Sequence, residues 1–104
     1  MSAVALGPQD RGREVPVHVG DRIVLRLPEN PTTGFRWAGD IPSFLHVERD
    51  NNETTAAPGA SSVRILELTV RTVGRAELRL ACGRAWDPSA APTDQFNVVV
   101  ESMP

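Results

Sequence analysis

Apolar and polar residues alternate along most of this chain at the two-residue spacing of a β-strand that buries one face. The clearest example lies between Arg22 and Leu27, where Ile23, Leu25 and Leu27 share one face. The same alternation marks residues 17–19, 35–37, 63–70, 75–82 and 96–100. The pattern therefore predicts six or more short strands with polar turns between them.

No segment sustains the 3.6-residue apolar period of a helix over three turns. The predicted fold class is all-β, an immunoglobulin-like β-sandwich of about seven to eight antiparallel strands. Trp37 and Cys82 continue inward-facing alternations, so we expect both in the core. His18 falls between two valines and is expected to face solvent.

Segments without an apolar pattern divide the chain. Residues 1–14 are predicted to be a mobile N-terminal tail, which leaves residues 15–104 as one folded domain. The predicted connections are a turn over residues 39–43, a long loop over residues 49–62 and a second long loop over residues 86–94. Residues 44–48 between them fit a short strand or a single helical turn.

Composition and charge exclude several classes of partner. The net charge of −2 argues against nucleic acid, and no stretch approaches the roughly 20 apolar residues that span a membrane. The first seven residues lack the basic region of a signal peptide. As written, the sequence therefore predicts a cytoplasmic protein, and it leaves export open if a signal has been trimmed. The single cysteine excludes an intramolecular disulfide, and we expect a monomer.

Side chains suited to catalysis or metal binding are few and scattered. They are His18, His46 and Cys82, and no His-x-x-x-His or Cys-x-x-Cys spacing joins them. A small enzyme would require these three to converge with carboxylates in one pocket. The sequence accordingly predicts no catalytic residue, no metal site and no cofactor.

The segment Asn30–Phe35 combines stiffness with exposed hydroxyl groups. Pro31 fixes its own φ and biases the residue before it towards an extended conformation, whereas Gly34 permits a turn. Thr32 and Thr33 are β-branched, and each carries a hydroxyl. A loop of this kind loses little conformational entropy on binding, which favours a recognition loop. The alternative is an ordinary hairpin turn.

Two further segments carry residues of the kind found at binding surfaces. Residues 56–62 form a loop of small residues before one predicted strand, and residues 83–88 follow another. Trp86 in the second segment is either a plug at the end of the core or an exposed anchor. Arg84 beside it can stack on a partner, donate two hydrogen bonds or simply solvate the loop.

The order and spacing of these three loops resemble the chagasin-like family of cysteine-protease inhibitors. The resemblance runs from about Val15 to Glu101, nearly the whole chain. Its most specific part is the first loop, Asn30-Pro31-Thr32-Thr33-Gly34-Phe35, which matches the family motif at every position.

The resemblance implies an inhibitor of papain-like cysteine proteases. In that family three loops at one end of the sandwich form a wedge that occludes the active-site cleft. By this likeness, Thr32 and Thr33 would supply hydrogen bonds over the catalytic Cys–His pair, and Gly59 would lie in a loop that pairs with an extended protease segment. Arg84 and Trp86 would pack on the opposite wall of the cleft. The implied protease-binding residues are Asn30, Pro31, Thr32, Thr33, Gly34, Phe35, Gly59, Arg84 and Trp86.

Three positions depart from the family pattern. Ala85 replaces the proline of an Arg-Pro-Trp motif, Ser61 replaces the second glycine of a Gly-x-Gly motif, and Cys82 stands where an aromatic residue is usual. A loop without that proline has more conformations to lose on binding. The sequence therefore predicts a weaker or altered inhibitor. The alternative is a β-sandwich protein-binding module that keeps the loops but no longer inhibits a protease.

Overall fold

The computed structural model describes residues 2–29, 35–54, 62–84 and 92–104, and within these ranges it contains eight β-strands. A short 3-10 turn, η1 (Pro8–Asp10), follows the first strand. The strands are β1 (Ala3–Leu6), β2 (Glu14–His18), β3 (Arg22–Pro28), β4 (Phe35–Asp40), β5 (Leu45–Thr54), β6 (Ser62–Val70), β7 (Gly74–Arg84) and β8 (Asp94–Met103).

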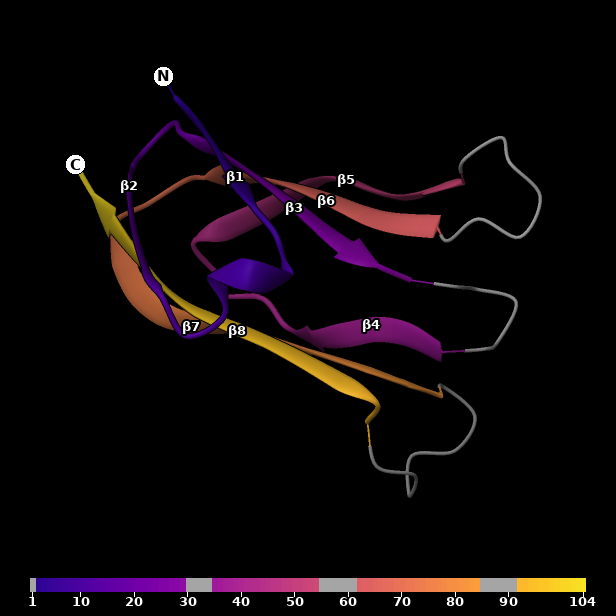
Figure 1. Ribbon diagram of the computed structural model, residues 1–104. Helices are drawn as coiled ribbons and strands as arrows, with labels where there is room; N and C mark the ends of the chain where they lie inside the picture. The colour runs from indigo at the N-terminus through magenta and orange to yellow at the C-terminus, as the bar shows by residue number, and fades with distance from the viewer. Residues whose placement is uncertain (1, 30–34, 55–61, 85–91) are drawn as a thin grey trace.

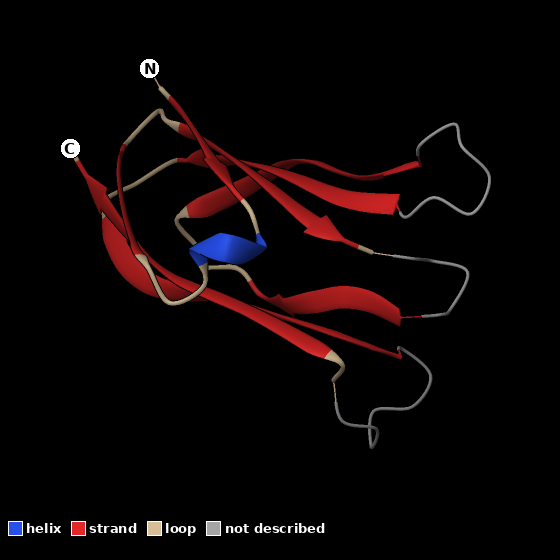
Figure 2. Cartoon of the chain, in the orientation of Figure 1, coloured by secondary structure: helices blue, strands red, loops and turns tan. Residues whose placement is uncertain are grey.

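The strands form two four-stranded sheets that pack face to face (Figure 1). The first sheet has the order β1-β3-β6-β5 and the second the order β2-β8-β7-β4. In the described part of the chain, η1 is the one helical segment (Figure 2), and no helix there is long and apolar enough to cross a membrane. The predicted all-β sandwich is confirmed.

Two strand pairs are parallel, which corrects the prediction of an entirely antiparallel sandwich. β1 runs parallel to β3, with Ala3 opposite Arg22, and β2 runs parallel to β8, with Glu14 opposite Val99. The other pairs, β3–β6, β5–β6, β4–β7 and β7–β8, are antiparallel. Alternation along a strand reveals which side chains face the core, but it carries no information on the direction of the neighbouring strand.

The core lies between the two sheets, and the alternating apolar residues fill it as predicted. Ile23, Leu25, Leu68 and Leu78 are fully buried, and so is Val98. Trp37 and Cys82 are also buried, which confirms both core predictions. Burial of one face per strand is therefore the main source of hydrophobic stabilisation in this fold.

The predicted mobile tail is wrong for most of its length. Residues 3–6 form β1, and Leu6 is buried in the core. The carboxylate of Asp10, also buried, accepts hydrogen bonds from the Gly7 amide and the Arg13 guanidinium. A four-residue edge strand is too short to show a clear period, and its backbone hydrogen bonds come from tertiary pairing with β3. The folded unit thus begins at Ala3 rather than at residue 15.

The predicted loop over residues 49–62 is also wrong at both ends. Residues 49–54 continue β5, with Asn52 opposite Arg64, and Ser62 opens β6. β5 is the outer strand of the first sheet, so most of its residues are polar and exposed. A register shift between Val47 and Arg49 interrupts any alternation that would have marked this strand.

Candidate functional site

The strand ends that bound three connections lie at the same end of the sandwich, on the right in Figure 1. The connections join β3 to β4, β5 to β6 and β7 to β8. The strand ends that bound them are neighbours, because Pro28 faces Val63, Phe35 faces Arg84 and Cys82 faces Asp94. Strand register within each sheet and the packing of the two sheets therefore bring the strand ends that bound the three candidate loops to one end.

Most of the candidate site residues lie outside the described residues. These are Asn30, Pro31, Thr32, Thr33, Gly34, Gly59 and Trp86, together with the departures Ser61 and Ala85. Phe35 and Arg84 are described, and they lie at the roots of the first and third connections. The roles of all these residues in binding stay predictions.

Phe35 and Arg84 join two of the connections. They are cross-strand partners at the ends of β4 and β7, and the guanidinium carbon of Arg84 lies 4.8 Å from the centre of the Phe35 ring. This is the geometry of a cation–π contact. The contact links the point where the first connection ends to the point where the third begins.

Thr93, the last residue before β8, is hydrogen-bonded to β7. Its backbone N–H and its hydroxyl both donate to the Cys82 carbonyl, at 2.8 and 3.2 Å. The thiol of Cys82 points into the core, and burial raises its pKa. A neutral, shielded thiol fits the predicted role of a small buried hydrophobe.

A buried carboxylate, that of Glu29, lies at the root of the first connection. It is 4% exposed and accepts three hydrogen bonds of 2.8 Å. The donors are the backbone N–H of Trp37, the side-chain amide of Asn52 and the guanidinium of Arg64. Trp37 is on β4 in the second sheet, whereas Asn52 and Arg64 are on β5 and β6 in the first sheet. Glu29 directly follows β3 of the first sheet, so its carboxylate connects the two sheets.

Arg64 is shared between two carboxylates. Its Nη1 donates to Glu29, while Nε and Nη2 donate to the two oxygens of Asp50 at 2.5 and 3.0 Å. Hydrogen bonding to Asp50, helped by the charge of Glu29, raises the pKa of the Arg64 guanidinium. Its side chain is only 18% exposed, so most of this strand arginine is shielded from solvent.

Sequence reasoning missed this cluster. Glu29 follows a proline at a strand end and precedes the recognition loop, a position that suggests an exposed turn residue. Asn52 falls within the long loop predicted over residues 49–62, so its pairing with Arg64 on the following strand was not predicted. Their only sequence signal was a lone acidic residue next to the most distinctive motif.

The three side chains considered for catalysis do not converge. His18 lies on β2 beside Asp21, and His46 lies on β5 beside Glu48, with both imidazoles largely exposed. Cys82 is buried on β7. Among the described residues no group of three or more His, Cys, Asp or Glu side chains could hold a metal ion.

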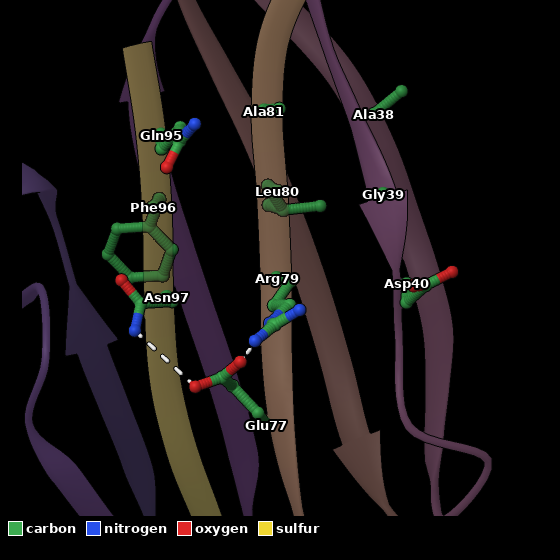
Figure 3. A pocket seen from close by; sticks show the side chains of 10 residues that line it. All are labelled: Ala38, Gly39, Asp40, Glu77, Arg79, Leu80, Ala81, Gln95, Phe96 and Asn97. Atoms are coloured by element: carbon green, nitrogen blue, oxygen red, sulfur yellow. Dashed lines mark hydrogen bonds and ion pairs between the residues drawn. The ribbon is translucent and has the colours of Figure 1, made fainter.

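A groove of about 460 Å³ lies on the second sheet, and Figure 3 shows its lining side chains on β4, β7 and β8. The Glu77 carboxylate in it accepts from the Arg79 guanidinium and from the Asn97 amide. Its lining on β7 runs from Glu77 to Ala81 and does not include Phe35 or Arg84 at the roots of the connections.

Several known proteins resemble this chain in sequence or in fold. Chagasin from Trypanosoma cruzi is 26% identical over 99 residues, which cover 88% of this chain and 90% of chagasin. The solved cysteine protease inhibitor from Entamoeba histolytica shares the fold with a TM-score of 0.93 at 22% identity, over 99% of this chain and 97% of that one. PbICP-C, solved in complex with falcipain-2, has a TM-score of 0.65 at 14% identity, over 99% of this chain and 100% of that one.

The family itself is established by sequence. The model of the chagasin family of peptidase inhibitors matches residues 16–100, from β2 into β8. This range contains the roots of all three connections and the buried cluster around Glu29. The chain therefore belongs to the chagasin family of peptidase inhibitors, whose members are inhibitors and not enzymes.

Proposed function

We propose that this protein inhibits papain-like cysteine proteases by filling the active-site cleft with the three connections at one end of its sandwich. The observation that carries the proposal is the placement of three strand connections, one of them with the complete family motif, at a single end. Family membership supplies the class of activity. The relatives' own targets support the class of partner, since PbICP-C was solved with falcipain-2.

The proposed mechanism is occlusion and uses no chemistry from the inhibitor. A cysteine protease needs a substrate carbonyl held close to its thiolate in attack geometry. A segment that fills the cleft without presenting a peptide bond in that geometry blocks turnover and is not consumed. Thr32 and Thr33 would donate and accept hydrogen bonds over the catalytic pair, and Trp86 would anchor the third connection.

The described roots of the loops favour this mechanism. The Phe35–Arg84 contact and the two Thr93 hydrogen bonds hold the strand ends at fixed separations. Rigid strand ends reduce the entropy that a loop between them loses on binding. An inhibitor that presents its binding loops from rigid strand ends of a β-sandwich gains affinity from this preorganisation.

Steady-state inhibition of papain and of a cathepsin-L-like enzyme tests the proposal. Thr32→Ala and Trp86→Ala should each weaken binding by more than about 1 kcal/mol, because each removes a contact central to the proposed interface. Arg71→Ala is the matched control, since Arg71 is exposed at the opposite end, next to the turn before β7. The control variant should inhibit as the unsubstituted protein does.

A folded sample that inhibits neither enzyme at tens of micromolar would contradict the proposal. The protein would then be a binding module on the same sandwich. If neither substitution weakens inhibition, the protein is still an inhibitor, but the surface that contacts the protease lies elsewhere than the three connections.

A further inference from the structure

Five residues form a hydrogen-bonded cluster around the buried carboxylate of Glu29, at the strand ends that bound the first two connections. The Glu29 clip comprises Glu29, Trp37, Asp50, Asn52 and Arg64. A groove of about 350 Å³ opens beside it, yet the Glu29 side chain is only 2% exposed. Each oxygen of that carboxylate is occupied, Oε1 by Asn52 and Oε2 by both Trp37 and Arg64.

Within the Glu29 clip, the residues before and after the first connection are joined to each other by hydrogen bonds. Glu29 precedes residues 30–34, and its carboxylate accepts from the backbone N–H of Trp37, which follows them. In return the indole N–H of Trp37 donates to the carbonyl of Pro28 at 2.8 Å. The Glu29 backbone N–H also donates to the Ser62 carbonyl at 3.0 Å. Two hydrogen bonds thus fix the end of β3 relative to β4, and the third ties the end of β3 to the start of β6.

The same carboxylate reaches the strands on both sides of the second connection. Asn52 on β5 and Arg64 on β6 are register partners, and they flank residues 55–61. Both donate to Glu29. One side chain therefore couples the ends of two connections, one that crosses from the first sheet to the second and one that joins the paired strands β5 and β6.

Stability alone does not explain this arrangement. The attraction within a buried ion pair is largely offset by the loss of hydration. Well-packed apolar residues at the same positions would therefore stabilise the fold about as much. What a charged and fully hydrogen-bonded group adds is a defined geometry. Asp50 gives Arg64 a second anionic partner, which holds the guanidinium plane in one orientation.

We propose that Glu29 is a positioning residue for inhibition: through Trp37, Asn52 and Arg64 it sets the separation and direction of the strand ends that present the first two loops to a protease. The proposal rests on the inhibitory function proposed above and deepens it. Glu29 itself is buried and need not touch the protease.

The test compares Glu29→Ala and Glu29→Gln in inhibition assays with papain. Glu29→Ala removes all three acceptor contacts and should raise the inhibition constant at least about tenfold, mainly through faster dissociation. Glu29→Gln keeps the length of the side chain and loses the charge, so it should lie between Glu29→Ala and the unsubstituted protein. If Glu29→Ala fails to fold, Glu29→Gln carries the test.

Two measurements separate positioning from a general loss of stability. Leu78→Ala is the matched control, because Leu78 is fully buried in the middle of β7, away from the clip. It should lower stability but leave the inhibition constant unchanged at a temperature where circular dichroism reports full folding. Hydrogen exchange of the Trp37 backbone N–H should accelerate selectively in Glu29→Ala and not in Leu78→Ala.

Folded Glu29 variants that inhibit as tightly as the unsubstituted protein would overturn the proposal. Leu78→Ala that weakens inhibition as much as Glu29→Ala would also overturn it, since the effect would then be one of stability. If the unsubstituted protein inhibits no papain-like protease, the proposed function falls and the positioning role falls with it. That outcome is distinct, because it appears before any Glu29 variant is compared.

Discussion

At the scale of single residues, two glycines of the same strand pair have opposite constraints. Gly39 on β4 lies opposite Leu80, and a Cβ added to it would come within 2.0 Å of the Arg79 carbonyl oxygen. Gly83 on β7 lies opposite Arg36, and a Cβ there would meet no atom within 4 Å. Only the first glycine is required by the close approach of two backbones.

Gly39→Ala should therefore lower the free energy of unfolding by about 1–3 kcal/mol, because the methyl group forces β4 and β7 apart. Gly83→Ala is the control and should change it by no more than about 0.5 kcal/mol. Urea denaturation followed by circular dichroism measures both values. Equal effects of the two substitutions would show that the strands can adjust at Gly39 without cost.

At the scale of elements, β1 extends the first sheet beyond what the sequence pattern predicted. It runs parallel to β3 and places Leu6 in the core, while Ala5, which pairs with Val24, is exposed. The N-terminal residues thus cover one edge of β3 and contribute apolar burial. A mobile tail would do neither.

Leu6→Ala should lower the free energy of unfolding by about 2–4 kcal/mol, since it removes a buried side chain and leaves a cavity. Ala5→Ser, at an exposed position of the same strand, should stay within about 0.5 kcal/mol of the unsubstituted protein. Thermal or urea unfolding of both variants measures these changes in the free energy of unfolding. An unchanged midpoint for Leu6→Ala would restore the interpretation of residues 1–14 as a tail.

At the scale of the whole molecule, two buried aspartates make stability depend on pH. Asp10 accepts from the Gly7 amide and the Arg13 guanidinium, and Asp21 accepts from the His18 and Ser2 amides. These hydrogen bonds lower the pKa of both carboxyl groups below the ordinary value of 3.8. The Asp21 carboxylate ties Ser2, just before β1, to the turn after β2, and the Asp10 carboxylate holds η1 to the residues on either side of it.

Because each pKa is lower in the folded chain, the unfolded chain takes up these protons first as the pH falls. The stabilisation is fully present above the unfolded pKa of about 4 and is lost as the pH falls through the lower folded pKa. Urea midpoints at pH 6 and pH 3 should differ clearly for the unsubstituted protein. Asp10→Asn/Asp21→Asn should be less stable at pH 6 but should lose less between the two pH values. A drop of the same size in both proteins would rule out these groups as the cause.

The sequence predicted the fold best where burial alone sets the pattern. Ile23, Leu25, Leu78 and Val98 are buried as their alternation required. It failed at β1 and at the second half of β5, where strands are short, polar or at an edge. Edge strands form through backbone pairing with a neighbour, and that pairing leaves little trace in the identity of their side chains.

The candidate site divides in the same way. The sequence by itself determined the family, the strand alternation and the order of three connections, because these depend on local conformational preference and on which residues avoid water. Only the tertiary structure decided that Glu29, Trp37, Asn52 and Arg64 meet beneath the loops. Their encounter depends on strand register and on the packing of one sheet against the other, and such long-range geometry is set by the fold as a whole.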